Sequence, residues 1–268
     1  MDNTQAAQAP ALTGQVLFYK NPQPLTPEKH GGLGVKQVPE PFAFLRTSHA
    51  IPLTISEFGT AAASYPIIFV GTDLTPVAVM GIRQDENLFV TEAGQIEPDF
   101  YAPAFVRRYP FVFANDDKGD RLLLCVDRDA AMVSNQPEVP FFKDGQPTEF
   151  TQNAIEFCKE FERQRRATVD FTARLKALDI FSQKTVSFQP RDQQGKETGP
   201  AQKIADYWGV DEEKLNALSD EKYNELRTSG ALPGIYAHMV SLLNWNRVIQ
   251  RAARKQEAKP TTSDVGQA

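Results

Sequence analysis

The chain has 268 residues, 41% of them hydrophobic and with 18 Phe and 7 Tyr, a composition that fits a folded globular protein and excludes a wholly disordered one. Its formal net charge of −5 provides no overall basic surface, so we expect no nucleic-acid partner. The two cysteines, Cys125 and Cys158, are too few for a disulfide scaffold and are predicted to be buried free thiols.

The first 13 residues are polar and lack the basic and apolar regions of a secretory signal. Apolar runs such as Tyr65 to Val70 are too short to span a bilayer, so we expect a cytoplasmic protein with no membrane span. Residues 1–13 and 257–268 are predicted to be disordered tails. The remainder, 14–256, is predicted to be one compact domain, with a sheet-rich part (14–147) and a helix-rich part (148–256).

The first half of the chain alternates short apolar runs with turn residues, a pattern typical of antiparallel strands. The run from Val16 to Tyr19 predicts an edge strand, which an extended arm follows. The predicted elements after it are a short helix at 55–64, strands at 66–70, 76–82 and 88–90, a helix at 100–109, and a hairpin of 111–114 with 121–126 around a turn at 115–120.

The second half of the chain is predicted to be mainly helical. A stripe of apolar residues with a charged opposite face indicates a long helix over 148–178. Two strands follow, at 185–188 and 204–210. Asp211 and Ser219 are predicted N-caps, Gly230 is a predicted left-handed C-cap, and Pro233 begins a final helix. Together these elements predict an α+β fold: a largely antiparallel meander sheet, a long covering helix and a C-terminal helical hairpin.

The sequence offers little recognisable chemistry. It has three histidines and no HExxH, CxxC or H-x-D pattern, so we expect no metal site and no cofactor. The run Gly31-Gly32-Leu33-Gly34 lacks the spacing of a phosphate-binding loop and is predicted to be a flexible loop. No GxSxG motif is present, neither cysteine lies in a familiar nucleophile motif, and no catalytic residue can be assigned.

A few residues are candidates for ligand binding. His49 precedes an apolar run and could line a cleft, and the adjacent Arg107 and Arg108 could hold an anion. His238 could present a polar group toward the sheet, and Trp245 with Trp208 could floor an aromatic pocket. For each candidate the sequence also allows a structural role, which we favour: a hydrogen-bonded histidine, an arginine paired with a nearby acid, or an aromatic residue of the core.

The blocks YPIIFVG, PVAVMGI, NLFV, YAPAFVRRYPFVFA and VDEEKLNALSDEKYNELRTSGALPGIYAHMVSLLNW occur in this order. In these blocks and in their order, the sequence resembles the soluble bacterial SapC-like family over about residues 14–254. Peptide-transporter permeases of the same name are a different family, because they span the membrane. Members of the soluble family are commonly encoded beside outer-membrane receptors and flavin-dependent halogenases. The resemblance therefore implies a protein partner, such as a flavin-dependent enzyme or a receptor component, and it carries over no catalytic residues.

Three hypotheses of function follow. The scarcity of candidate nucleophiles and bases favours an intracellular accessory or binding protein, which should present an apolar groove or patch. The alternative is an enzyme, or an enzyme subunit, with a site built from His49, Arg107, Arg108 and an acid, which should converge on one pocket. The third, a surface-layer structural protein, follows from the family's name alone and ranks last.

Overall fold

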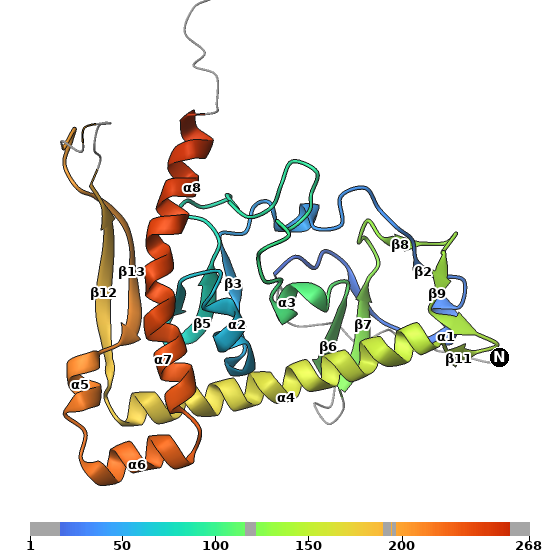
Figure 1. The fold of residues 1–268 in the computed structure, drawn as a ribbon. Helices are drawn as coiled ribbons and strands as arrows, with labels where there is room; N and C mark the ends of the chain where they lie inside the picture. The colour runs from blue at the N-terminus through green and yellow to red at the C-terminus, as the bar shows by residue number, and fades with distance from the viewer. Residues whose placement is uncertain (1–16, 116–121, 190–193, 195–196, 258–268) are drawn as a thin grey trace, which may run out of the picture. The chain divides into compact units, whose positions relative to one another are not determined.

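The computed structural model of the protein describes residues 17–115, 122–189, 194 and 197–257 (Figure 1). The described chain forms two compact units, the first built from 17–44 and 105–163 and the second from 45–104 and 164–257. The prediction of a single domain stays a prediction. The predicted tails lie outside the described residues, except for Glu257, which is the last residue of the final helix. Most of the predicted turn at 115–120 also lies outside them.

The first unit contains short antiparallel strands in two small sheets and one hairpin, of strand order β1-β7-β6, β8-β2-β9 and β10-β11. Their bounds are β1 Pro22–Pro24, β2 Gly34–Val35, β6 Phe111–Asn115, β7 Leu122–Asp127, β8 Val133–Ser134, β9 Val139–Pro140, β10 Phe142–Lys143 and β11 Gln146–Pro147. The helices are α1 (Pro27–His30), η1 (Ala43–Leu45), α3 (Ala104–Arg107) and the first half of α4 (Glu149–Ala177), of which η1 and α3 also reach one residue into the second unit. The core includes Leu33, Phe111, Val126, Phe141, Phe142 and Cys158.

The second unit contains a five-stranded antiparallel sheet of order β12-β13-β4-β5-β3. Its strands are β3 (Ala50–Pro52), β4 (Ile67–Val70), β5 (Thr75–Val79), β12 (Phe181–Phe188) and β13 (Gln202–Val210). Its helical elements are η2 (Ile55–Glu57), α2 (Phe58–Ala61), the second half of α4, α5 (Glu212–Asn216), α6 (Asp220–Thr228), α7 (Leu232–Ser241), η3 (Leu242–Asn244) and α8 (Trp245–Glu257). In Figure 1, α7, η3 and α8 form one continuous column beside the strands.

The α+β class, the antiparallel strand pairing, the long helix and the helical C-terminal stretch are confirmed. The hairpin of β6 with β7 and the helix α4 form close to their predicted bounds. The side chain of Asp211 accepts hydrogen bonds from the backbone N–H groups of Glu213 and Lys214, and Ser219 caps α6 in the same way. Gly230 has a φ of +73°, the left-handed conformation that ends a helix.

Several local predictions were wrong, two of them because a side chain competes for the backbone. The strand predicted at 88–90 is reduced to a single bridge at Val90, because the Asn87 side chain accepts the N–H of Phe89. The helix predicted at 100–109 is only α3, because the N–H of Tyr101 donates to Ser64 Oγ and not to a helical carbonyl. The edge strand predicted from Val16 to Tyr19 is not found at Leu17–Tyr19, and Val16 lies outside the described residues. An edge strand forms instead at β1.

Gly34 does not lie in a flexible loop, so the loop prediction is wrong at this residue. It forms β2, the central strand of its sheet. A Cβ atom at this position would lie 2.1 Å from the carbonyl oxygen of Val139 in β9, so the strands can approach this closely only because residue 34 is glycine. The cysteine prediction is confirmed, since both thiols are free and buried.

The buried face of α7 carries two polar residues, His238 and Ser241, beside Gly234 and Ile235. The Nδ1 of His238 bonds to the carbonyl oxygen of Ile67 at 2.8 Å, and its Nε2 accepts the N–H of Val210 at 3.0 Å. These contacts bridge β4 and β13, which pair directly at a single position, Trp208 with Phe69. The hydroxyl of Ser241 accepts the N–H of Ile67 at 2.8 Å. Hydrogen bonds to backbone groups of β4 and β13, two inner strands of the sheet, therefore hold α7 in place.

Candidate binding pocket

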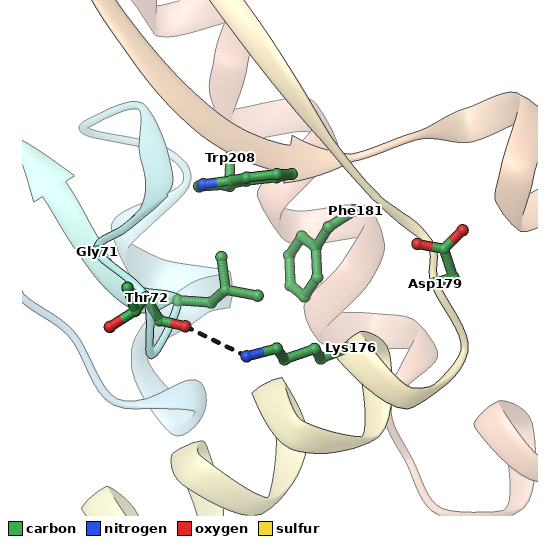
Figure 2. Close-up of a pocket in the computed structure, with 7 residues that line it drawn as sticks. Gly71, Thr72, Lys176, Asp179, Phe181 and Trp208 are labelled. Atoms are coloured by element: carbon green, nitrogen blue, oxygen red, sulfur yellow. Dashed lines mark hydrogen bonds between the residues drawn. The ribbon is translucent and has the colours of Figure 1, made fainter.

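A pocket of about 550 Å³ opens in the second unit beside the C-terminal end of α4 (Figure 2). Three parts of the chain converge there: the β4–β5 turn, the segment that links α4 to β12, and β13. The lining residues are Gly71, Thr72, Leu74, Lys176, Asp179, Phe181 and Trp208.

Two turns with left-handed backbone give the pocket its shape. Gly71 has a φ of +72° and Leu74 a φ of +52°, so the β4–β5 turn bends sharply and buries the Leu74 side chain. Asp179 has a φ of +52° and reverses the chain from α4 into β12. The Lys214 ammonium secures this second turn, because it donates to Asp179 Oδ2 and to the carbonyl oxygen of Phe181, each at 3.1 Å.

Aromatic rings form two walls of the pocket. The ring of Trp208 lies across one side, and Phe181 stands between it and Lys176 (Figure 2). Phe181 is buried and packs edge-on against Phe69, with 4.8 Å between the ring centroids. Trp208 remains 38% exposed although its strand, β13, has a neighbouring strand on both sides. A large indole face at the mouth of a concave site is therefore accessible to a ligand.

The polar groups at this pocket are few. The Lys176 ammonium donates to the carbonyl oxygen of Thr72 at 3.3 Å, which holds the cation beside the β4–β5 turn. Asp179 lies on the far side of Phe181 from Thr72 in Figure 2, and its carboxylate is engaged by Lys214. The arrangement can hold a flat apolar group against the rings and attract an acceptor or an anionic substituent toward Lys176.

The residues predicted for an anion or catalytic site are located as follows. His49 is exposed immediately before β3, in the second unit. Arg107 and Arg108 belong to the first unit, at and just after the end of α3. The guanidinium of Arg107 lies 5.2 Å from the ring centroid of Phe157. Their predicted convergence on one site stays a prediction.

Arg108 is surrounded mainly by aromatic rings. Its guanidinium carbon lies 4.2 Å from the ring centroid of Phe105 and 4.3 Å from that of Phe161. Burial lowers the pKa of this guanidinium from its usual value, and the neighbouring Tyr19 and Glu162 act in the opposite direction. Cation–π contacts of this kind stabilise the core of the first unit.

His238 and Trp245 are both buried in the second unit. The hydrogen bonds of His238 to β4 and β13 engage both ring nitrogens, so the imidazole is neutral with its proton on Nδ1. Burial lowers the pKa of His238 to about 4. Trp245 packs in the core against Tyr207, with 5.8 Å between ring centroids. The structural role that the sequence allows for each residue matches these contacts.

Two fully engaged carboxylates were not recognised from the sequence. Glu57 Oε2 accepts from the N–H and hydroxyl of Thr54, and Oε1 accepts from the hydroxyl of Tyr101 and the N–H of Ala104. Asp127, in the first unit, accepts from the N–H groups of Lys20, Asn21 and Asp129 and from the hydroxyl of Tyr109. Both carboxylates fasten loops through hydrogen bonds, so their role is structural.

The two cysteine thiols are buried and unreactive. Burial raises the pKa of the Cys125 and Cys158 thiols to about 11, so both are protonated near neutral pH. Within the described residues, no group of three or more His, Cys, Asp or Glu side chains could hold a metal ion. No helix in the same part of the chain is long and apolar enough to cross a membrane.

A protein-family model described as SapC matches residues 25–248, most of the chain. The chain belongs to the SapC family. No curated protein and no solved structure matches this SapC-family protein at a significant level. The match includes every residue that lines the pocket, so the pocket lies inside the family domain.

Proposed function

We propose that this SapC-family protein is a binding protein that takes a small, mainly apolar ligand with a flat ring in the pocket beside Trp208. The accessible indole face of Trp208 in a concave site supports the proposal. The volume of about 550 Å³ lies in the range of about 300–1,000 Å³ that is typical of small-molecule sites. The position of Lys176 beside the rings favours a ligand with an anionic or acceptor group.

The test uses fluorescence, because the chain has only two tryptophans. In a Trp245→Phe variant, which keeps a buried aromatic ring, Trp208 is the single indole reporter. Anilinonaphthalene sulfonate, an aromatic anion, serves as the probe. We expect saturable quenching of Trp208 with energy transfer to the probe, and a dissociation constant that rises when Lys176→Met removes the cation.

The matched variants compare two half-exposed aromatic residues. Monitored by the fluorescence of the probe, Trp208→Ala should weaken binding by about tenfold or more, because the stacking surface is lost. Tyr236→Ala removes an aromatic ring that does not line the pocket and should leave the affinity unchanged. Equal affinities of the wild type and the Trp208→Ala variant would contradict the proposal.

We further propose that ligand binding serves a protein partner, in keeping with the genomic neighbours of the SapC-like family. Copurification of the tagged full-length chain from its native host, with and without the Trp208→Ala substitution, tests this role. A stoichiometric flavin-dependent enzyme or receptor component would support it. Recovery of the tagged protein alone would contradict it and leave the pocket proposal intact.

A further inference from the structure

The outer face of α7 and η3 has an unusual polarity. A surface helix normally buries its apolar residues and exposes its polar ones. Here three of the five buried residues of α7 and η3 are polar, whereas several large apolar residues face solvent; the buried five are Gly234, Ile235, His238, Ser241 and Asn244. Tyr236 is 44% exposed, Val240 59% and Leu243 77%.

These three residues form one continuous surface. Tyr236, Val240 and Leu243 are spaced i, i+4 and i+7, which places them on the same side of a helix. We call them the α7 stripe. The hydroxyl of Tyr236 bonds to the hydroxyl of Tyr223 in α6 at 2.9 Å, which fixes the end of the stripe next to α6. The stripe is therefore a rigid apolar ridge on packed elements.

The charges at the two ends of the stripe are opposite. Before it, residues 211–228 contain six acidic and three basic residues, a net charge of −3. After it, residues 245–257 contain four basic residues and one acidic residue, a net charge of +3, and two of these cations, Arg251 and Lys255, pair with Glu97 and Glu86 of the same chain. Figure 1 shows α5 and α6 at one end of the α7–α8 column and α8 at the other.

We propose that the α7 stripe is a self-association surface, on which a second copy of this chain docks its own stripe in antiparallel orientation. A two-fold axis through the stripe brings each acidic end against the basic end of the other copy and pairs the apolar side chains with themselves. The stripe is separate from the pocket, because the two share no residue.

Sedimentation equilibrium of the full-length chain tests the proposal. The wild type should associate to a dimer with a dissociation constant below about 100 μM. Replacing Val240→Glu and Leu243→Glu together should raise that constant by about a hundredfold or more, because each substitution acts twice in a symmetric interface. Val169→Glu changes an equally exposed apolar residue of α4 and should leave dimerisation unchanged.

A charge-swap experiment distinguishes specific self-association from nonspecific aggregation. One variant carries Arg254→Glu, and a second carries Glu212→Lys and Asp220→Lys. Circular dichroism confirms that both fold. Each alone should dimerise more weakly than the wild type, and an equimolar mixture should form heterodimers, since both reversed contacts then match. A wild type that is monomeric at about 500 μM, or a mixture that does not associate, would overturn the proposal.

Discussion

Replacing Glu57→Ala should lower the free energy of unfolding by about 3 kcal/mol or more, because several buried donors lose their acceptor together. The carboxylate is 5% exposed and receives four hydrogen bonds. Glu57→Gln should also destabilise the fold, since an amide nitrogen would face the N–H or hydroxyl donors at one side of the site. Urea denaturation at pH 7 measures both effects.

The control is Glu92→Ala, which removes an exposed carboxyl from the same unit and should change stability by less than about 0.5 kcal/mol. A Glu57→Ala variant as stable as the Glu92→Ala variant would show that the hydrogen bonds of Glu57 are dispensable. The same outcome would show that the first N–H of α3, at Ala104, does not need this acceptor.

Stability should fall between pH 6.5 and pH 4 because of His238. Burial holds the pKa of His238 at about 4, below its ordinary value of 6.5. In that interval the unfolded chain binds a proton that the folded chain does not, so the free energy of unfolding decreases as the pH falls. Two and a half pH units correspond to roughly 3 kcal/mol from this group. The contribution is fully present above pH 6.5 and is lost at pH 4.

A His238→Gln variant separates this group from all others that titrate. Glutamine retains a donor and an acceptor but does not titrate, so the variant should be less stable at pH 7.5 and less sensitive to acid. Between pH 6.5 and pH 5 the wild type should lose about 2 kcal/mol more than the variant, as measured by urea denaturation at each pH. Parallel stability curves for the two proteins would contradict this account.

Local sequence patterns predicted most helices and strands of the fold. They predicted few of the hydrogen bonds that join side chains to distant parts of the backbone. The stripe of α4 and the caps at Asp211 and Ser219 depend on residues a few positions apart, so a single sequence reveals them. Glu57 accepts the first N–H of α3, at Ala104, from 47 positions away, and no local pattern carries that information. His238 bridges strands 171 and 28 positions away for the same reason.

The pocket was predicted only in part. An aromatic floor formed by Trp208 and Trp245 was considered, and Trp208 does line the pocket with Phe181, whereas Trp245 packs in the core. The signal that could have separated them is their position. Trp208 is two positions after Asp206 in β13, so it shares the exposed face of the strand with that charged residue. Trp245 belongs to the apolar stripe of the last helix. Lys176 and Leu74 gave no signal, because their contribution depends on turns with left-handed backbone.

The interleaving of the two units has a consequence for synthesis on the ribosome. β4 pairs with β5 as soon as their short turn emerges, but its other neighbour, β13, begins at Gln202. Elongation at about 5–20 residues per second separates the two events by roughly 6–25 s. Through that interval the nascent chain presents an open, apolar strand edge, Ile67–Val70, which is a template for aggregation. Efficient production of this protein should therefore depend on a chaperone that shields this edge until β13 arrives.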